Sequence, residues 1–263
     1  AFLDVTEDKQ GIGSAIEMGK DIRAFINRYC GRFDTPVFSA TIGGTLCHFV
    51  GSPLDAHLAF KPTTALDFST IGSQFLVRAV GTPPDLVDAA YQDQAGMKKV
   101  QSFLQRYIKS PKAMQDNVEA SQRILVKKLE ELVLMYGRDT ASAGSWFRVP
   151  LYDMSLRLVF AASVGPLLSE EIATDEMARH FSTWNHSAPL LFANVPSVFL
   201  RKAIASREEM VRILKSPLFS ESMTEHFKKR KDLYPDPELF ARSALSMVFA
   251  ASGNSIPSVF WMI

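Results

Sequence analysis

Cysteine is the residue type in this chain with the most distinctive chemistry, because a thiolate can bind zinc and a thiol pair can form a disulfide. Cys30 and Cys47 have no Cys or His partners at the short spacing that a zinc site requires. The sequence therefore predicts no metal site. We expect both thiols to be small buried side chains in a reducing compartment, with a disulfide between them as the alternative.

Asn254 is a second candidate for chemistry, because it lies inside an apolar run from Ala244 to Ile263. Pro257 cannot donate the backbone hydrogen bond of its own helical turn, so it should loosen a helix just past Gly253. The residues alone leave two roles for Asn254. Its amide either satisfies backbone carbonyls beside the proline or faces a ligand.

The same apolar run is long enough to raise the question of a transmembrane helix. Asn254, Pro257 and several serines would be costly against lipid, and no basic cluster follows the run. We therefore expect a helix buried in a protein core, with a membrane span as the alternative. The run stops without a cap, and the chain starts at Ala1 without a signal peptide, so we expect both ends to be cut.

Composition and charge exclude several classes of protein. The 263 residues are 47% hydrophobic and 22% charged, which is typical of a globular protein with a large core. Lys and Arg number 29 against 28 Asp and Glu, so the net charge of +1 offers no field for a polyanion. We expect no nucleic-acid partner. The cluster of His226 and Lys228 to Lys231 is interpreted as a solvated helix end without a catalytic role.

Hydrophobic periodicity defines the elements that must position these residues. It predicts an amphipathic helix over residues 16–30 and a β-hairpin over residues 34–50 with paired glycines at its turn. Ser52 predicts the cap of a short helix that begins at Pro53. Two strands alone do not make a stable sheet, so we expect further strands from chain beyond Ile263.

The rest of the chain, residues 95–263, is predicted to be helical. Helices are expected at residues 95–108, 112–136, 150–164, 170–184, 204–214, 219–230 and from 236 onward. In the longest of them, the face that should be buried carries Leu125, Leu129, Leu132 and Tyr136. The fold class is therefore mainly α with a small β-hairpin near the N-terminus (α+β), as a single partial domain over residues 1–263.

Three strings carry a resemblance to a known family: Leu66–Phe68 (LDF) followed closely by Phe75, Trp146–Asp153 (WFRVPLYD) and Phe249–Trp261 (FAASGNSIPSVFW). The last is the most specific. Its Asn254, Pro257 and Phe260-Trp261 match a Trp-Ala-Ser/Thr-x-x-Asn-x-x-Pro-x-x-Phe-Trp pattern, with Phe249 in place of the first Trp. The chain resembles the N-terminal half of a cytochrome P-450, a heme-thiolate monooxygenase, in the branch that holds sterol 7-alpha- and 12-alpha-hydroxylases and prostacyclin synthase.

This resemblance implies an incomplete cytochrome P-450 fold, truncated in or after the I helix that passes over the heme. Small residues there would let the helix backbone approach a flat macrocycle. The resemblance makes Asn254 the catalytic polar group and implies a substrate and oxygen groove of Ala250, Ala251, Gly253, Ser255 and Phe75. It also places Ala251 and Lys98 at the heme, with Lys98 on a propionate; a solvated lysine is the alternative.

The resemblance implies heme as the cofactor of a longer protein. The family's iron ligand lies in a Phe-x-x-Gly-x-x-x-Cys-x-Gly loop beyond the I helix, which this chain lacks, and neither Cys30 nor Cys47 is placed to replace it. The chain alone is therefore expected to be inactive.

For the full-length protein the resemblance implies oxygen-dependent hydroxylation of a sterol or other lipid. Electrons would come from an NADPH-cytochrome reductase at the endoplasmic reticulum membrane surface, with an N-terminal anchor that is not in this chain. The family's acid and threonine are missing from residues 250–254. That absence leaves an isomerase of the prostacyclin-synthase type as one alternative and a degenerate non-catalytic fragment as another.

Overall fold

The computed structural model describes residues 12–33, 36–42, 44–59, 68–136, 148–234 and 236–263. The chain is mainly α-helical with a small antiparallel hairpin near the N-terminus, which confirms the predicted fold class. It forms two compact units, Ala1–Phe68 and Ser69–Ile263. The single-domain expectation stays a prediction. Parts of two family-like strings, Leu66-Asp67 and Trp146-Phe147, lie outside the described residues.

The first unit consists of α1 (Ile12–Lys20), α2 (Ile22–Phe33), β1 (Val37–Ile42), β2 (Thr45–Val50) and α3 (Pro53–Ala59). The single helix predicted over residues 16–30 is two helices, because Asp21 interrupts it. The carboxylate of Asp21 accepts a hydrogen bond from the Ala24 backbone N–H at 2.9 Å, so it caps the start of α2.

The hairpin of the first unit has the predicted turn. Ile42 pairs with Thr45 across it, and Gly44 adopts a φ of +82°, which a residue with a side chain rarely takes. Phe25 of α2 and Phe38 of β1 are fully buried against each other. Within the described residues the sheet has two strands, and both cysteines are free.

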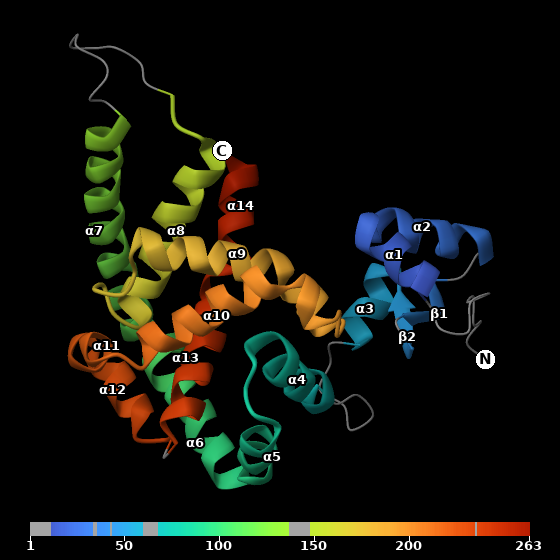
Figure 1. Ribbon diagram of the computed structural model, residues 1–263, viewed down its shortest axis with the longest axis horizontal. Helices are drawn as coiled ribbons and strands as arrows, with labels where there is room; N and C mark the ends of the chain where they lie inside the picture. Colours follow the sequence, from blue (N-terminus) through green and yellow to red (C-terminus); the bar gives the residue numbers. More distant parts are fainter. Residues whose placement is uncertain (1–11, 34–35, 43, 60–67, 137–147, 235) are drawn as a thin grey trace. The chain divides into compact units, whose positions relative to one another are not determined.

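The second unit is a helical assembly. Its elements are α4 (Ser69–Phe75), the π-helical turn η1 (Leu76–Val80), α5 (Pro84–Gln92), α6 (Gln94–Leu104), the π-helical turn η2 (Gln105–Lys109), α7 (Pro111–Tyr136), α8 (Leu151–Leu167), α9 (Asp175–Phe192), the 3-10 turn η3 (Ser197–Phe199), α10 (Arg201–Leu214), α11 (Pro217–Ser222), α12 (Glu225–Lys231), α13 (Pro237–Ser252) and α14 (Ser255–Met262). Helix α7 packs along α8, and α9 packs along α10 (Figure 1).

The core of this unit lies among α8, α9, α10 and α13. Phe160, Trp184 and Leu245 are completely buried there. Trp184 also donates its indole N–H to the Ala79 carbonyl at 3.0 Å, which ties α9 to η1. A buried indole needs such a partner, so this hydrogen bond fixes where η1 lies.

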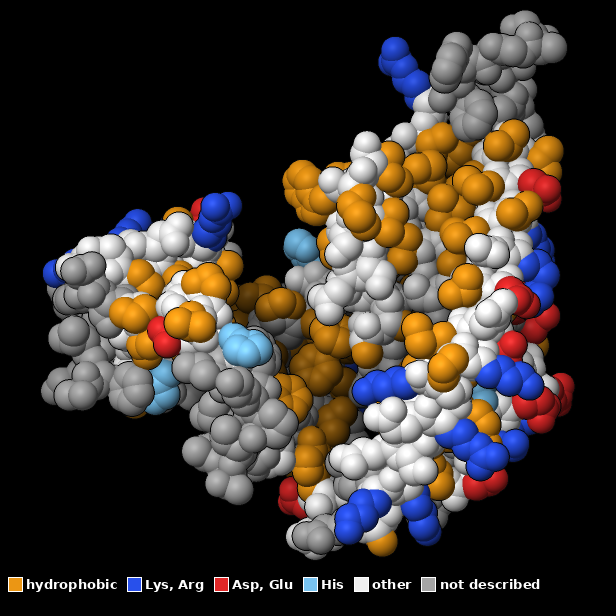
Figure 2. All heavy atoms as spheres, turned by 180° about the vertical axis from the view of Figure 1, so that it is seen from behind, with side chains coloured by type: hydrophobic (Ala, Val, Ile, Leu, Met, Phe, Trp, Pro, Cys, Tyr) orange, Lys and Arg blue, Asp and Glu red, His pale blue; other side chains and the backbone are white. Residues whose placement is uncertain are grey.

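The long helix α7 was predicted correctly, whereas its buried face was predicted only in part. Leu132 is buried as expected, whereas Leu129 is 46% exposed and Ile124 is buried instead. Lys128 lies on the inner side, where its ammonium pairs with Glu131 at 2.7 Å and with Asp175 at 3.5 Å. On the part of the surface that α7 contributes, Figure 2 shows hydrophobic side chains among charged ones. This agrees with the exposure of Leu129 and Leu134.

The predicted C-terminal helix is broken into α13 and α14 at Gly253 and Asn254. Pro257 has no N–H to donate to the carbonyl four residues before it, so the helical ladder is interrupted where the sequence predicted. Among the helices that the structure describes, none combines the length and apolar character that a membrane crossing requires.

Candidate functional site

A cavity of about 650 Å³ lies within the second unit, between α5, α6 and η2 on one side and α12 and α13 on the other. This volume is in the usual range for small-molecule sites. Most of its lining is aliphatic or aromatic. The cavity can therefore hold an apolar molecule of moderate size.

Helix α13 forms one wall of the cavity because the residues at its inner positions are small or flexible. Ser243, Ser246, Met247 and Ala250 recur at the i, i+3, i+4, i+7 spacing of one helical face and all line the cavity. Larger side chains at Ser246 and Ala250 would fill this space. The opposite wall is apolar and comes from Val100, Leu104 and Ile108 of α6 and η2.

The wall made by α13 is fixed in place by a buried cation. Arg242, which is 7% exposed, donates to Glu208 of α10 through two nitrogens, at 3.0 and 2.7 Å. The same guanidinium donates to the Val80 carbonyl of η1 at 2.9 Å and to Glu238 at 2.9 Å. One side chain thus joins α10, α13 and η1. Charge-assisted, two-pronged hydrogen bonds of this kind are strong and directional.

Arg230 of α12 is the most unusual polar residue of the lining. It is 5% exposed, and its Nη2 donates to the Tyr234 hydroxyl at 3.0 Å and to the Ser243 hydroxyl at 2.7 Å. Its Nε and Nη1 are buried and have no hydrogen-bond partner. Burial lowers the pKa of Arg230 from its ordinary value, because the charged form loses its hydration.

Thr82, which follows η1, gives the cavity a second polar group without a partner. Its side chain is 2% exposed, and its hydroxyl oxygen meets no hydrogen-bonding group. A buried polar atom of this kind is normally satisfied, so each exception asks for an explanation. Thr82 and Arg230 both line this cavity.

The structure brings together only part of the predicted groove. Ala250 and Ala251 line the cavity. Asn254 is exposed at the start of α14, and its carbonyl accepts from the Ser258 hydroxyl at 2.7 Å. Ser255 bonds back to the Ala251 carbonyl at 2.8 Å, as helical serines often do.

Three further predicted site residues are also outside the lining. Phe75 packs against Phe249, with ring centroids 4.9 Å apart, and so belongs to the core beside the cavity. Gly253 lies at the helix break, where an added Cβ would come within 2.8 Å of the Phe249 carbonyl. Lys98 is exposed on α6. The roles given to these three residues stay predictions.

The lining fits the apolar and flat-ligand side of a heme pocket but not its axial ligand. Ala250 and Ala251 present little bulk, which suits a planar macrocycle. The lining contains neither Cys nor His, and Cys30 and Cys47 lie in the first unit. In the described part of the chain, no group of His, Cys, Asp and Glu could hold a metal ion.

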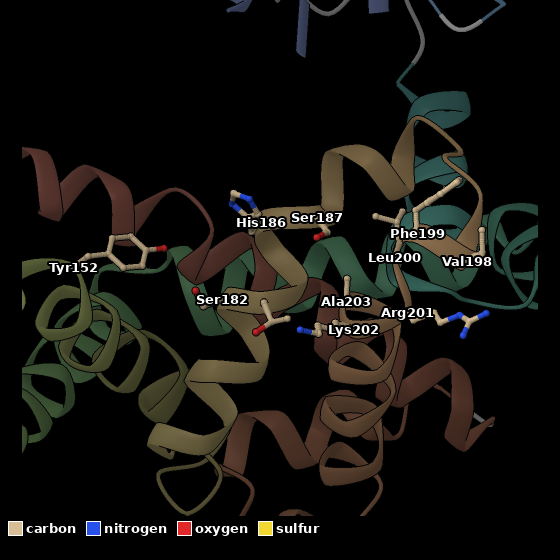
Figure 3. Close-up of a pocket in the computed structure, with 11 residues that line it drawn as sticks. Tyr152, Ser182, His186, Ser187, Val198, Phe199, Leu200, Arg201, Lys202 and Ala203 are labelled. Atoms are coloured by element: carbon tan, nitrogen blue, oxygen red, sulfur yellow. The ribbon is translucent and has the colours of Figure 1, made fainter. Parts of the chain in front are cut away.

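A second cavity, of about 640 Å³, lies beside α9, η3 and the start of α10. Figure 3 shows that its polar side chains do not converge: Arg201 points away from Lys202, and His186 lies apart from both. No hydrogen bond or ion pair among the described residues joins these three. We therefore assign this cavity no chemistry.

Sequence reasoning missed the two residues that most distinguish the first cavity. Arg230 lies within the charge cluster interpreted as solvated, and its neighbours Lys229 and Lys231 are indeed exposed. The signal that separates it is helical spacing, because Phe227 and Tyr234 lie three residues before and four residues after it. Thr82 has no comparable signal, since it is placed by the turn at Gly81.

Comparison with known protein families and with curated proteins identifies no relative of this chain. No protein-family model matches the chain, and no curated protein matches it. The geometry of the cavity therefore stands beside the sequence resemblance as the basis for function.

Proposed function

We propose that this chain supplies the substrate-facing half of a heme-thiolate enzyme, a cytochrome P-450, that hydroxylates a sterol or other lipid with dioxygen in the full-length protein. The observation that carries the proposal is the cavity of about 650 Å³ lined by Ala250 and Ala251. The resemblance assigns both residues to the substrate and oxygen groove of the I helix, and it also places Ala251 at the heme. Cavity and resemblance thus favour the same stretch of α13.

Within this proposal, the chain's own residues bind and shield the substrate. Val100, Leu104 and Met247 would contact its apolar body and exclude water from it. Ala250 and Ala251 would leave space for the cofactor. Heme supplies oxygen activation when it is bound, and its thiolate ligand must come from residues other than those that line this cavity.

The partners follow from the same proposal. An NADPH-cytochrome reductase would deliver the electrons, and the enzyme would work at the endoplasmic reticulum membrane surface. The chain by itself would bind lipid without oxidising it.

An isomerase of the prostacyclin-synthase type is the second candidate. Residues 250–254 (AASGN) contain neither the acid nor the threonine that deliver protons to bound oxygen in the hydroxylases. An isomerase starts from a peroxide and needs no reductant. The two candidates are separated by adding a lipid peroxide without NADPH to the full-length protein, because only the isomerase would convert it.

The transcript beyond the codon for Ile263 provides the most direct test. We expect an open frame that encodes a Glu-x-x-Arg pair followed by the cysteine loop, and a product whose absorption spectrum is that of thiolate-ligated heme. A stop codon directly after Ile263 in every transcript would overturn the enzymatic proposal and leave a non-catalytic fragment.

The cavity itself can be tested on the 263-residue chain. Ala250→Trp places a large side chain in the lining, so it should weaken binding of a fluorescent sterol by about tenfold or more. Ala205→Trp is the matched control, because Ala205 is exposed on α10 outside the cavity. Equal loss in both variants would show that the cavity is not the binding site.

A further inference from the structure

The starting observation is a buried cation without a counter-ion. The other well-buried arginines of the second unit, Arg242, Arg207 and Arg157, all pair with carboxylates. Arg230 is 5% exposed, and no carboxylate in the described part of the chain lies within ion-pair distance of it. A buried, uncompensated charge is strongly unfavourable, so such residues are kept where something binds them.

Aromatic rings surround Arg230 but do not neutralise it. Its Cζ lies 5.7 Å from the ring centre of Phe103, 6.0 Å from that of Phe227 and 5.2 Å from that of Tyr234. Cation–π attraction of this kind stabilises the charge in part. Arginine stays protonated in proteins, and two nitrogens of this guanidinium have no hydrogen-bond partner.

The two hydroxyls in contact with Arg230 are placed to serve a ligand. Tyr234 and Ser243 both accept a hydrogen bond from Nη2, and both line the cavity. A hydroxyl that accepts can still donate its own proton. Neither proton has an acceptor among the described residues. Two polarised O–H donors therefore line the cavity beside the cation.

An acidic residue, Asp93, also lines the cavity, but it does not neutralise the charge of Arg230. Asp93 lies at the junction of α5 and α6, where its carboxylate accepts from the Gly96 backbone N–H at 2.9 Å and caps α6. It is exposed and makes no ion pair with Arg230. The charge of Arg230 is thus left for a group that enters the cavity.

We propose that the cavity binds an apolar molecule with one carboxylate, whose two oxygens accept from the Tyr234 and Ser243 hydroxyls in front of the Arg230 guanidinium. The apolar body would lie along Leu104, Ile108 and Met247. This inference names the ligand class of the cavity, and it rests on the proposed function only in taking that cavity as a ligand site. The unpartnered Thr82 hydroxyl offers a second contact, for a hydroxyl or carbonyl group elsewhere on the ligand.

The test compares dodecanoate with dodecanol by isothermal titration calorimetry on the 263-residue chain at neutral pH. The two probes share an apolar body and differ in the head group. Charge-assisted hydrogen bonds predict that dodecanoate binds at least about tenfold more tightly. Equal affinities would overturn the inference while leaving the cavity as a lipid site. Binding of neither probe would overturn the inference and also remove the cavity as support for the proposed function.

Variants test whether the preference for dodecanoate over dodecanol depends on Arg230 and on the two hydroxyls that it contacts. Arg230→Gln should reduce the dodecanoate-to-dodecanol ratio to about one by removing the charge. The double variant Tyr234→Phe with Ser243→Ala keeps the charge and removes both hydroxyl donors, so it should reduce the same ratio. If circular dichroism shows that Arg230→Gln does not fold, the double variant and the comparison of the two probes carry the test.

Lys229→Gln is the matched control, because Lys229 is the exposed neighbour of Arg230 and its loss changes the net charge equally. Its dodecanoate-to-dodecanol ratio should equal that of the unaltered chain. A ratio that falls as much in Lys229→Gln as in Arg230→Gln would overturn the inference in favour of a general charge effect.

Discussion

Arg242 of α13 donates two hydrogen bonds to the carboxylate of Glu208 of α10, from Nη1 to Oε1 at 3.0 Å and from Nη2 to Oε2 at 2.7 Å. Arg242 is 7% exposed, whereas the Glu208 side chain is 43% exposed. The pair is therefore buried on the side of the cation and reachable by water on the side of the acid. This asymmetry decides how the pair responds to substitution and to pH.

Substituting Arg242→Met should destabilise the chain by about 2 kcal/mol, because the Val80 carbonyl and the two glutamates lose their donor while the glutamates regain some hydration. Denaturant unfolding followed by circular dichroism measures this change. Arg212→Met is the control, since the Arg212 pair with Glu209 is exposed and should contribute well under 1 kcal/mol. Equal losses in the two variants would contradict the role given to Arg242.

The pair also predicts an acid dependence. Burial raises the pKa of Glu208, whereas the hydrogen bonds and charges of Arg242 and Arg207 lower it. The lowering effect is the larger of the two, so the pKa of Glu208 is below the ordinary value of 4.5. The stabilisation is present above pH 4.5 and is lost as the pH falls through the lower pKa of the folded chain. Glu208→Gln should therefore be less stable at pH 7, with a difference that shrinks below pH 4.5. A difference that is constant with pH would contradict this prediction.

Gly81 is required by the turn that places Thr82. Its φ is +77°, and an added Cβ would lie 2.5 Å from the Arg207 guanidinium carbon. Gly81→Ala should lower the free energy of unfolding by about 1 to 2 kcal/mol. Gly31→Ala in α2 is the contrasting variant: its Cβ would meet no atom within 4 Å, so a gain of about 0.5 to 1 kcal/mol is expected. Thermal unfolding of both variants checks the opposite signs.

Pro257 accounts for the break between α13 and α14. Pro257→Ala restores an N–H that can reach the Gly253 carbonyl, so amides from 254 to 258 should exchange more slowly and the chain should gain about 1 kcal/mol. Pro237→Ala is the control, because Pro237 is at the first position of α13, where a missing N–H costs nothing. Hydrogen exchange followed by mass spectrometry measures both. Unchanged protection in Pro257→Ala would place the cause of the break elsewhere, at Gly253.

Trp184 and Trp261 give a matched pair of tryptophan substitutions. Trp184 is completely buried and donates to the Ala79 carbonyl, whereas Trp261 is 82% exposed. Trp184→Phe should cost about 2 kcal/mol from the lost hydrogen bond and the space left behind, and Trp261→Phe should cost close to none. Denaturant unfolding of the two variants tests this, and similar costs would contradict the anchoring role of Trp184.

Much of the fold is local and was therefore accessible from sequence. The hairpin turn at Gly44 and the long helix α7 both follow from patterns within a few residues. Helix α5 was missed, because none of the predicted helices covers residues 84–92, although Pro84 is suited to the first turn of a helix. The buried face of α7 was predicted only in part, since Lys128 turns inward to meet Asp175, which is distant in sequence.

The candidate site was less accessible, because it depends on contacts between distant segments. Ala250 and Ala251, which the resemblance assigns to a substrate and oxygen groove, both line the cavity, and their role stays a prediction. The environment of Arg230 depends on Phe103, and no sequence pattern near Arg230 predicts that contact. Thr82 likewise faces the cavity only because Trp184 and Arg242 hold η1 in place.

The hydrogen bond from Arg242 to the Val80 carbonyl has a consequence for synthesis on the ribosome. Its two residues are 162 positions apart, so the turn carrying Thr82 leaves the exit tunnel long before its anchor does. Contacts of such high sequence separation form late, because their loop-closure entropy must be overcome first. During that interval the walls from α5 and α6 expose apolar surface, which is the state that chaperones bind. The cavity can thus take shape in a growing chain only after α13 has been synthesised.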